Sequence, residues 1–469
     1  WEDPSLRVTY AAKPAAVHDT IVTWIEEIAD NAEVEHLDLH LPTRYYPVWE
    51  VHLDVHDSND THLEHKLRLD TVSGSEIPIA NRESGLVDWL KYFHHAFMWP
   101  DKLGGYYFGV VVVSFSGIIL LMVTVSGIVA HRKIIKQMFT LRPDRSVRIK
   151  WQDTHNVIGT WGVPFFLMIA ITGAYFGLTK SYYGHMTSLL GGADTFVSSE
   201  VQSLDRVHSI ADLGEVITFD EILRRPGPGD EPRPIELVVN GWGTSSMSYT
   251  ATYYDMEKGL GTARVTFDAF SGEVDQSMPV DAADERVVEI AQTLHFGSFG
   301  GVAITIVYIL LGLLMAVVIG LGNMMWIERR LHGNAGTKTA SFYHRISNLN
   351  IGICLGFPVG TALIFHANCI IPVTLDARLT LTGWIYFSGV FAAIGYAFIR
   401  SNGYRATREL LYAIGAMFVL LPFVNWATTS DLFLTDLISP TMTYAWVDVA
   451  FLLTGLTTLK AASMIPKDR

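Results

Sequence analysis

The sequence contains very little cysteine: Cys354 and Cys369 are its only two in 469 residues. They stand 15 positions apart in an apolar run, which is about 22 Å along a helix and too far for a disulfide bond. No Cys-x-x-Cys pair occurs. Covalently attached c-type haem and cysteine-ligated iron–sulfur clusters therefore have no support.

Nucleotide-binding and serine-hydrolase patterns are also absent. The sequence has no phosphate-binding loop, no dinucleotide-binding glycine pattern and no catalytic serine context. The glycines between Gly352 and Gly360 are spaced as in a membrane helix. We therefore expect no site for NAD(P)H or flavin in this chain, so that electrons for a redox reaction must come from a partner protein or from quinol.

Charged residues are scarce, at 17% of the chain against 49% apolar residues. This composition is typical of a polytopic membrane protein with a substantial extramembrane part. Residues 1–103 and residues 179–299 each hold 19 acidic and 8 basic residues, whereas the remainder holds 9 acidic and 18 basic ones. No block concentrates lysine and arginine as nucleic-acid binding requires, so nucleic acid is not an expected partner.

Seven apolar segments are long enough to cross a bilayer as helices, which takes about 20 residues each. They cover residues 104–131, 157–178, 300–327, 349–371, 381–399, 409–428 and 443–465. The loops 132–156, 328–348 and 400–408 are rich in arginine and lysine, whereas the loop 429–442 carries two aspartates and no base. The positive-inside rule predicts that the basic loops are cytoplasmic and that both acidic blocks are external, in the periplasm of a Gram-negative cell.

The two acidic blocks have the pattern of one small α+β fold that occurs twice. In the first, a helix is predicted over 14–32 and strands over 36–41, 47–55 and 63–69. In the second, a helix is predicted over 218–225 and strands over 235–240, 248–255 and 262–267, with a loop over 226–234. Each third strand runs into the same Asp-x-x-Ser-Gly turn, at Asp70 and at Asp268. The second block therefore repeats the first.

Histidines stand at the ends of the apolar segments. His94 and His95 precede the first segment, His131 ends it and His155 begins the second. His295 precedes the third segment in a glycine-rich stretch, which would let a flat porphyrin approach the helix closely. A neutral imidazole is a common axial ligand of haem iron. Histidines at both membrane faces therefore predict one haem at each face.

His95 and His295 are the expected ligands of an outer bis-histidine haem b, held between helices as bundles hold cofactors. His94 points about 100° away from His95 on a helix, so only one of the two is expected to ligate. His131 cannot share a haem with His95, because 36 helical residues span about 54 Å. The alternative for all of these histidines is a polar side chain that reaches water at the membrane surface.

Several stretches resemble a known family. The Asp-x-x-Ser-Gly turn after three strands, present twice, is similar to the PepSY domain. Three motifs resemble the core of the PepSY-associated transmembrane protein family: HHAFMWPDKLGG at 94–105, WQDTHNVIGTWGVPFFLMIAITGA at 151–174, and LHFGSFGG at 294–301 ahead of WIERR. The resemblance covers about residues 10–332. The last four helices resemble the tail of longer members less specifically.

The resemblance implies an iron-regulated membrane protein similar to the di-haem ferric-siderophore reductases of bacterial iron acquisition. It also makes His155 the best inner ligand. The partner of His155 is either His131 or a histidine on a further helix that the family core has before its first PepSY domain. Because the chain begins with Trp1 rather than Met, we expect a signal peptide or an eighth membrane helix before it.

We therefore expect a polytopic α-helical protein of the bacterial inner membrane with two small external α+β PepSY domains. The expected parts are a PepSY-like domain over 1–85, a lead-in helix with two membrane helices over 86–178, a second PepSY-like domain over 179–294, a membrane helix over 295–332 and a four-helix module over 333–469.

The expected function is electron transfer across the membrane through two haem b groups. The donor would be quinol or a cytoplasmic reductase, and the acceptor a ferric siderophore or other ferric chelate. The acidic outer blocks would repel anionic chelates, which counts against an unassisted anionic substrate. Two alternatives stay open: a non-catalytic PepSY protein that binds or restrains a peptidase or another envelope protein, and an accessory subunit of a larger respiratory or transport complex.

Other polar residues have simpler interpretations. Alternation places two His-x-Asp-x-His groups each on one strand face, where a solvated surface is expected and a metal site is the alternative; they are His36, Asp38 and His40, and His52, Asp54 and His56. His344 and His366 bracket the fourth apolar segment, about 33 Å apart if helical, and are expected at the membrane surface. Asp448 is costly within a membrane helix, but it lies near the outer end, where hydration is expected.

Overall fold

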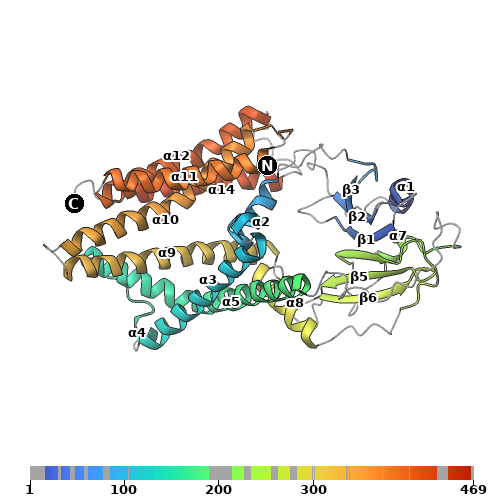
Figure 1. The fold of residues 1–469 in the computed structure, drawn as a ribbon, viewed down its shortest axis with the longest axis horizontal. Coiled ribbons are helices and arrows are strands. Elements are labelled where there is room, and N and C mark those ends of the chain that lie inside the picture. Colours follow the sequence, from blue (N-terminus) through green and yellow to red (C-terminus); the bar gives the residue numbers. More distant parts are fainter. Residues whose placement is uncertain are drawn as a thin grey trace. The chain divides into compact units, whose positions relative to one another are not determined.

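The computed structural model describes most of residues 16–465 (Figure 1). Within that range it does not describe residues 30–32, 43–47, 57–61, 78–84, 104, 132–133, 143, 190–213, 226–233, 255–261, 275–282, 298, 300, 334–335, 337, 373, 376, 401 and 430–441. Nearly all of the loops predicted over 226–234 and 429–442 therefore lie outside the described residues, as do the first two bases of the loop 132–156.

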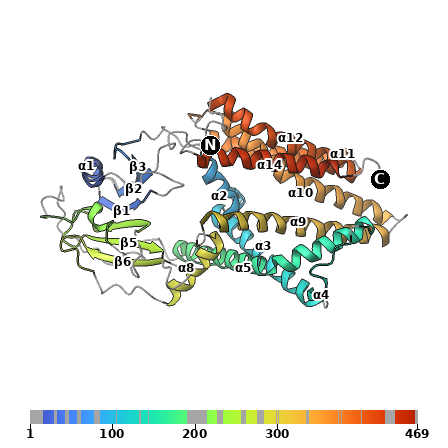
Figure 2. The same ribbon diagram turned by 180° about the vertical axis from the view of Figure 1, so that it is seen from behind.

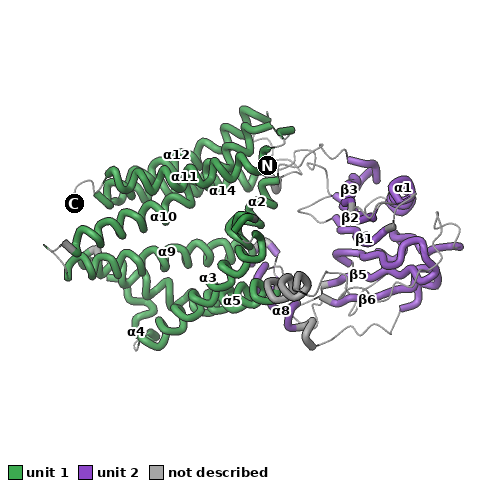
Figure 3. The backbone as a smooth tube through the Cα atoms, in the orientation of Figure 1, with its two compact units in different colours: residues 1–2, 81–181, 305–469 green, residues 3–80, 182–304 purple. Residues whose placement is uncertain are grey.

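The chain forms two compact units, and each is assembled from separate stretches of sequence (Figure 3). The helical unit contains residues 81–181 and 305–469, and the sheet unit contains residues 3–80 and 182–304. Both acidic blocks therefore contribute to a single unit. The expectation from the sequence was one small domain for each block.

Seven helices of the described chain are long and apolar enough to cross a membrane. They are α3 (Gly105–Ala130), α5 (Val147–Leu189), α9 (Gly301–Gly333), α10 (Lys338–Ile370), α11 (Arg378–Arg400), α12 (Gly403–Thr429) and α14 (Met442–Ser463). The predicted number and order of membrane helices are confirmed. Several helices are longer than their apolar segments, because polar residues continue the helix beyond the apolar part: α5 begins ten positions before residue 157, and α10 begins eleven before residue 349.

Glycines hold the four C-terminal helices close together. A side-chain carbon on Gly352 of α10 would lie 2.5 Å from Ile394 Cα, and carbons on Gly356 and Gly360 would approach backbone oxygens of α11. These three glycines recur every four residues, so they share one face of α10 and let the two backbones meet. The interpretation of this glycine run as membrane-helix packing is confirmed.

A short amphipathic helix, α2 (Leu86–Ala96), rests on this C-terminal module. Its Trp89 is 2% exposed and packs with Ile364 of α10 and with Tyr386 and Val390 of α11. Phe93 contacts the Tyr386 ring edge-on, at a centroid distance of 5.0 Å. The turn η2 (Asp101–Leu103) then leads into α3. The last four helices thus support the helix that carries His94 and His95.

The sheet unit is built on one six-stranded antiparallel sheet. Its strands are β1 (Glu33–His40), β2 (Val48–His56), β3 (His62–Asp70), β4 (Glu236–Asn240), β5 (Ser248–Tyr254) and β6 (Thr262–Asp268), in the order β3-β2-β1-β4-β5-β6. All six lie within two residues of the predicted positions at each end, except that β1 begins three residues earlier. The two three-stranded halves meet where β1 pairs with β4, and they lie side by side in both views (Figure 1, Figure 2).

The same turn closes both halves, as the repeat in the sequence predicts. Asp70 Oδ1 accepts hydrogen bonds from the backbone N–H and the hydroxyl of Ser73, at 2.8 and 2.9 Å. Asp268 Oδ1 accepts the same pair from Ser271, at 2.7 and 2.8 Å. These bonds to the ionised form lower the pKa of Asp268. The glycine that follows each serine has a φ of 69° or 66°, a conformation that favours glycine.

Helices α1 (His18–Ala29) and α7 (Phe219–Ile222) cover the apolar face of the sheet and cap one another. The carboxylate of Asp220 accepts the backbone N–H of Val17 at 3.2 Å and that of His18 at 3.1 Å. In return, His18 Nδ1 accepts the backbone N–H of Phe219 at 3.2 Å. Each helix thus has its free N–H groups satisfied by the other half of the repeat.

Candidate functional site

His94 and His95 occupy the last turn of α2. His94 is exposed and His95 is partly buried, and their ring centroids are 5.7 Å apart. The chain leaves the helix through Phe97 and Met98, which have φ values of 52° and 54°. Two successive residues in this region, neither of them glycine, store backbone strain of about 1–3 kcal/mol each. The end of α2 is therefore held in one particular conformation beside the two histidines.

Gly109 lets this end of α2 lie directly against α3. A side-chain carbon at Gly109 would overlap the backbone oxygen of Ala96, and it would also lie 2.8 Å from the side chains of Ala96 and Trp99. Ala96 follows His95 directly in the chain. The position of His95 is thus tied to the first turns of the first membrane helix.

His295 stands in the last turn of α8 (Ala283–Phe296), which belongs to the sheet unit. Gly297 ends the helix with a φ of 66°, and its N–H donates to Thr293 O at 2.9 Å. His295 is partly buried, with its ring 5.7 Å from that of Phe296. Because His95 belongs to the helical unit, the pairing of His95 with His295 on one haem stays a prediction.

His155 is held by a contact with another membrane helix. Its Nδ1 donates to the backbone oxygen of Val318 on α9 at 2.9 Å. Gly322, one turn further along α9, makes room for the ring, because a side-chain carbon there would lie 3.2 Å from His155 Cε1. Donation from Nδ1 fixes the tautomer in which Nε2 keeps its lone pair. A ligating histidine commonly has this arrangement, with one nitrogen bound to a backbone carbonyl and the other available to a metal.

His131 follows the last residue of α3 and is partly buried. Its Nδ1 is buried and has no hydrogen-bond partner among the residues that the structure describes. A buried imidazole nitrogen without a partner is costly, by about 1–3 kcal/mol. His131 as the partner of His155 on the inner haem stays a prediction.

An ion pair next to His155 was not predicted from the sequence. The guanidinium of Arg142 binds the Asp153 carboxylate through two nitrogens, at 2.9 and 2.6 Å, and the Arg142 backbone N–H adds a third bond at 3.0 Å. Asp153 is buried at 3% exposure. This pair fixes the basic loop to α5 two residues before His155. In the sequence, Asp153 is visible only as an acidic residue near a basic stretch, and this does not show which base it pairs with.

The polar residues of the C-terminal helices have structural roles. His366 Nε2 donates to Met417 O on α12 at 3.0 Å, so it joins two helices, whereas His344 is exposed on α10. The membrane-surface position expected for His366 stays a prediction. The hydration expected for Asp448 is wrong, because α14 packs tightly on α12 and leaves this residue only 4% exposed.

The two His-x-Asp-x-His groups lie on the face of the sheet opposite α1 and α7. Several of their side chains pair with acids: His40 Nε2 with Asp38 Oδ2 at 3.2 Å, His52 with Glu50 at 2.7 Å and His56 with Glu35 at 2.9 Å. Burial opposes ionisation of Asp38, but the hydrogen bond from His40 and the nearby imidazoles outweigh it and lower the pKa of Asp38. This hydrogen bond also raises the pKa of His40.

Together these features define a multi-pass helical membrane protein with an antiparallel sheet unit that two repeats share. The family of PepSY-associated TM regions matches residues 1–329. The chain belongs to this family, as the motifs around the histidines indicated.

One relative is an uncharacterized protein of Pseudomonas aeruginosa strain PAO1. It is 37% identical over 127 residues, which is 27% of this chain and 27% of the relative. The chain thus matches about a quarter of the length of that protein.

Proposed function

We propose that this protein carries electrons across the bacterial inner membrane through two haem b groups and reduces an external ferric chelate such as a ferric siderophore. The observation that carries the proposal is the setting of His155, whose Nδ1 donates to Val318 O, so that Nε2 keeps its lone pair. When bound, the haems would supply one-electron transfer, one electron for each ferric ion reduced.

The residues of the chain would hold, separate and shield the two groups. His155 would hold the inner haem, with His131 as the candidate second ligand in this chain. The outer haem would be held by His295 together with His95 or His94. Helix α3 separates His95 from His131 with 26 residues, about 39 Å along the helix axis, which is the scale of a whole bilayer. The histidines that α3 separates thus suit opposite faces of one membrane.

Reduction would release iron from its chelator, because hard oxygen donors hold iron(II) less well than iron(III). In this proposal the sheet unit lies outside and the basic loops lie in the cytoplasm, as the charge distribution predicts. The electron donor would be quinol or a cytoplasmic reductase. The acidic surface of the external blocks would slow the approach of anionic chelates at low salt.

The first experiment is an absorption spectrum of the purified full chain, oxidised and reduced with dithionite, with a pyridine haemochrome count. We expect about two haems b per chain with sharp low-spin α-bands. His155→Ala should lose one of the two, because the ring that Val318 O orients is gone. The matched control is His344→Ala, which removes an exposed histidine from α10 and should leave both haems in place.

Reduction itself is tested by mixing the reduced protein with ferric chelates in a stopped-flow spectrometer and following haem oxidation. A colourless wild-type protein would exclude this electron-transfer mechanism. A PepSY protein that binds a peptidase or another envelope protein would then be the better account. Copurifying subunits would favour the accessory role in a larger complex.

A further inference from the structure

A cluster of donor atoms lies at the junction between the two halves of the sheet. β1 pairs with β4 so that His40 stands opposite Glu236. Asp38 lies two residues before His40 and therefore on the same face. The apolar residues between them, Leu39 and Leu237, are fully buried on the other face. Asp38 and His40 thus come from the first half of the repeat, and Glu236 comes from the second.

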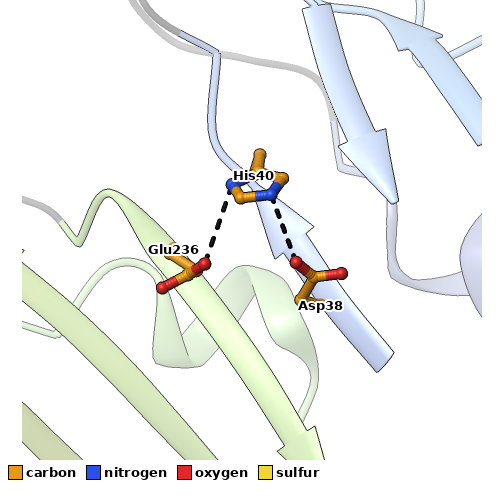
Figure 4. A group of neighbouring side chains, drawn as sticks. All are labelled: Asp38, His40 and Glu236. Carbon is orange, nitrogen blue, oxygen red and sulfur yellow. Dashed lines mark ion pairs between the residues drawn. The ribbon is translucent and has the colours of Figure 1, made fainter. Parts of the chain in front are cut away.

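The three side chains converge. Figure 4 shows the His40 imidazole between the two carboxylates, with Nε2 3.2 Å from Asp38 Oδ2 and Nδ1 3.9 Å from Glu236 Oε1. One donor atom can be chosen from each residue so that all three lie within 4.8 Å of one another. Ligands of a tetrahedral zinc ion are about 2.0–2.2 Å from the metal, so one nitrogen of His40 and both carboxylates would have to turn towards a common point to bind the same ion.

Asp38 gives an independent indication that a cation belongs here. It is 8% exposed, and its Oδ1 is buried without a hydrogen-bond partner within the described parts of the chain. Leaving a carboxylate oxygen in this state costs about 1–3 kcal/mol or more, because the group has lost its water. A metal ion beside Asp38 would remove this cost.

Further imidazoles surround the cluster. His36 Nε2 lies 4.0 Å from Asp38 Oδ1, and the ring centroids of His40 and His52 are 5.2 Å apart. Either histidine is close enough to complete the coordination after a change of rotamer, and water can do the same.

Arg68 lies on the same face of the sheet and pairs with an acid outside the cluster. Its Nε donates to Glu50 Oε2 at 2.7 Å, and the other oxygen of Glu50 binds His52 Nε2 at 2.7 Å. The cluster itself contributes two carboxylates, which attract a cation.

We propose that Asp38, His40 and Glu236 bind a divalent first-row transition-metal ion, with zinc as the reference ion. A donor set of one imidazole and two carboxylates suits zinc and leaves a position open for water or a fourth side chain. The bound ion would join the two halves of the sheet at the single strand pair that connects them. This inference does not depend on the proposed electron transfer.

The test is zinc binding by the full chain, purified in detergent with an affinity tag that contains no histidine. The protein is stripped with EDTA, dialysed against zinc at several concentrations and analysed for zinc by plasma mass spectrometry. We expect a saturable site of about one zinc per chain. Asp38→Asn and Glu236→Gln should weaken binding about tenfold or more, since even an outer partner of a metal ligand contributes that much.

The matched control is His65→Ala. His65 stands on β3 opposite Leu53, so it lies on the apolar face of the same sheet, and its loss should leave zinc binding unchanged. Zinc should also raise the Tm of the wild type and of His65→Ala but not that of Glu236→Gln. Glu236 is partly exposed, so this variant can be compared even where Asp38→Asn fails to fold.

Two results would overturn the proposal. One is a wild-type protein that retains no zinc above the background of the dialysis buffer. The other is equal zinc affinity in the wild type, Asp38→Asn and Glu236→Gln, which would place the bound zinc elsewhere and leave the cluster as a chain of ion pairs.

Discussion

At the scale of single residues, the role of each histidine is decided by the partner of its ring nitrogens. His155 donates to Val318 O and keeps a lone pair, whereas His366 donates to Met417 O and joins two helices. His18 does the opposite, because its Nδ1 accepts the N–H of Phe219. These three histidines thus have three different roles in the fold.

His18 should make the stability of the sheet unit depend on pH. Its acceptor role requires the neutral ring, and burial lowers its pKa below the ordinary value of 6.5. The unfolded chain then binds more protons in the window below pH 6.5. The contribution of this contact is complete above that pH and is lost as the pH falls through the lower folded pKa.

The corresponding measurement is the Tm of the sheet unit in the full chain, followed by circular dichroism at several pH values. His18→Asn keeps an acceptor near the position of Nδ1 but does not titrate, so we expect a smaller loss of Tm at acid pH than in the wild type. An identical pH dependence in both proteins would show that other groups are responsible, such as the Asp268 carboxyl, whose lowered pKa also makes stability fall at acid pH.

At the scale of elements, α2 shows what patterns of local sequence can and cannot predict. A lead-in helix was expected at the start of the segment 86–178, and α2 covers Leu86–Ala96. The local sequence does not say what packs against the apolar face of this helix. The structure covers that face with Tyr386 and Val390 of α11 and Ile364 of α10, which lie more than 260 residues further along the chain.

Gly109→Ala should disturb the end of α2. The new methyl group would collide with the backbone of Ala96, which cannot move aside as a flexible side chain can, and such overpacking costs about 1–3 kcal/mol. We expect a lower Tm of the purified protein and, under the proposed function, weaker binding of the outer haem with the inner haem unchanged.

Gly127→Ala on the same helix is the control, because nothing lies within 4 Å of the position of its new methyl group. It should leave the haem content unchanged. The Tm should be unchanged or slightly higher, since alanine favours a helix by about 0.5–1 kcal/mol over glycine. Equal effects of the two substitutions would mean that the contact between α2 and α3 does not decide the position of the histidines.

At the scale of the whole molecule, the chain alternates between its two units. The sheet unit receives residues 3–80 and 182–304, and the helical unit receives the stretches between and after them. Because β1 pairs with β4, neither half of the sheet is a separate domain. The membrane helices between the two halves must therefore insert before this pairing can form, or while it forms.

The predicted orientation can be tested with cysteine labelling. The two free cysteines, Cys354 and Cys369, are first replaced by serine. A membrane-impermeant maleimide should then label Val72→Cys, in an exposed turn of the sheet unit, in intact spheroplasts. Ser146→Cys, in the exposed basic loop before α5, should be labelled only after lysis. The reverse pattern would place the sheet unit in the cytoplasm and would contradict the positive-inside prediction.

Several features of the fold could be predicted from neighbouring residues. Apolar length specified the seven membrane helices, alternation specified the six strands, and Asp70 and Asp268 specified the repeated turn, because each of these patterns is set by local geometry. The contacts between distant segments are seen in the folded chain and not in any local pattern. The pairing of β1 with β4, the bond from His155 to Val318 and the cluster of Asp38, His40 and Glu236 each join residues more than 160 positions apart. Such contacts depend on packing and chain topology, which no local pattern specifies.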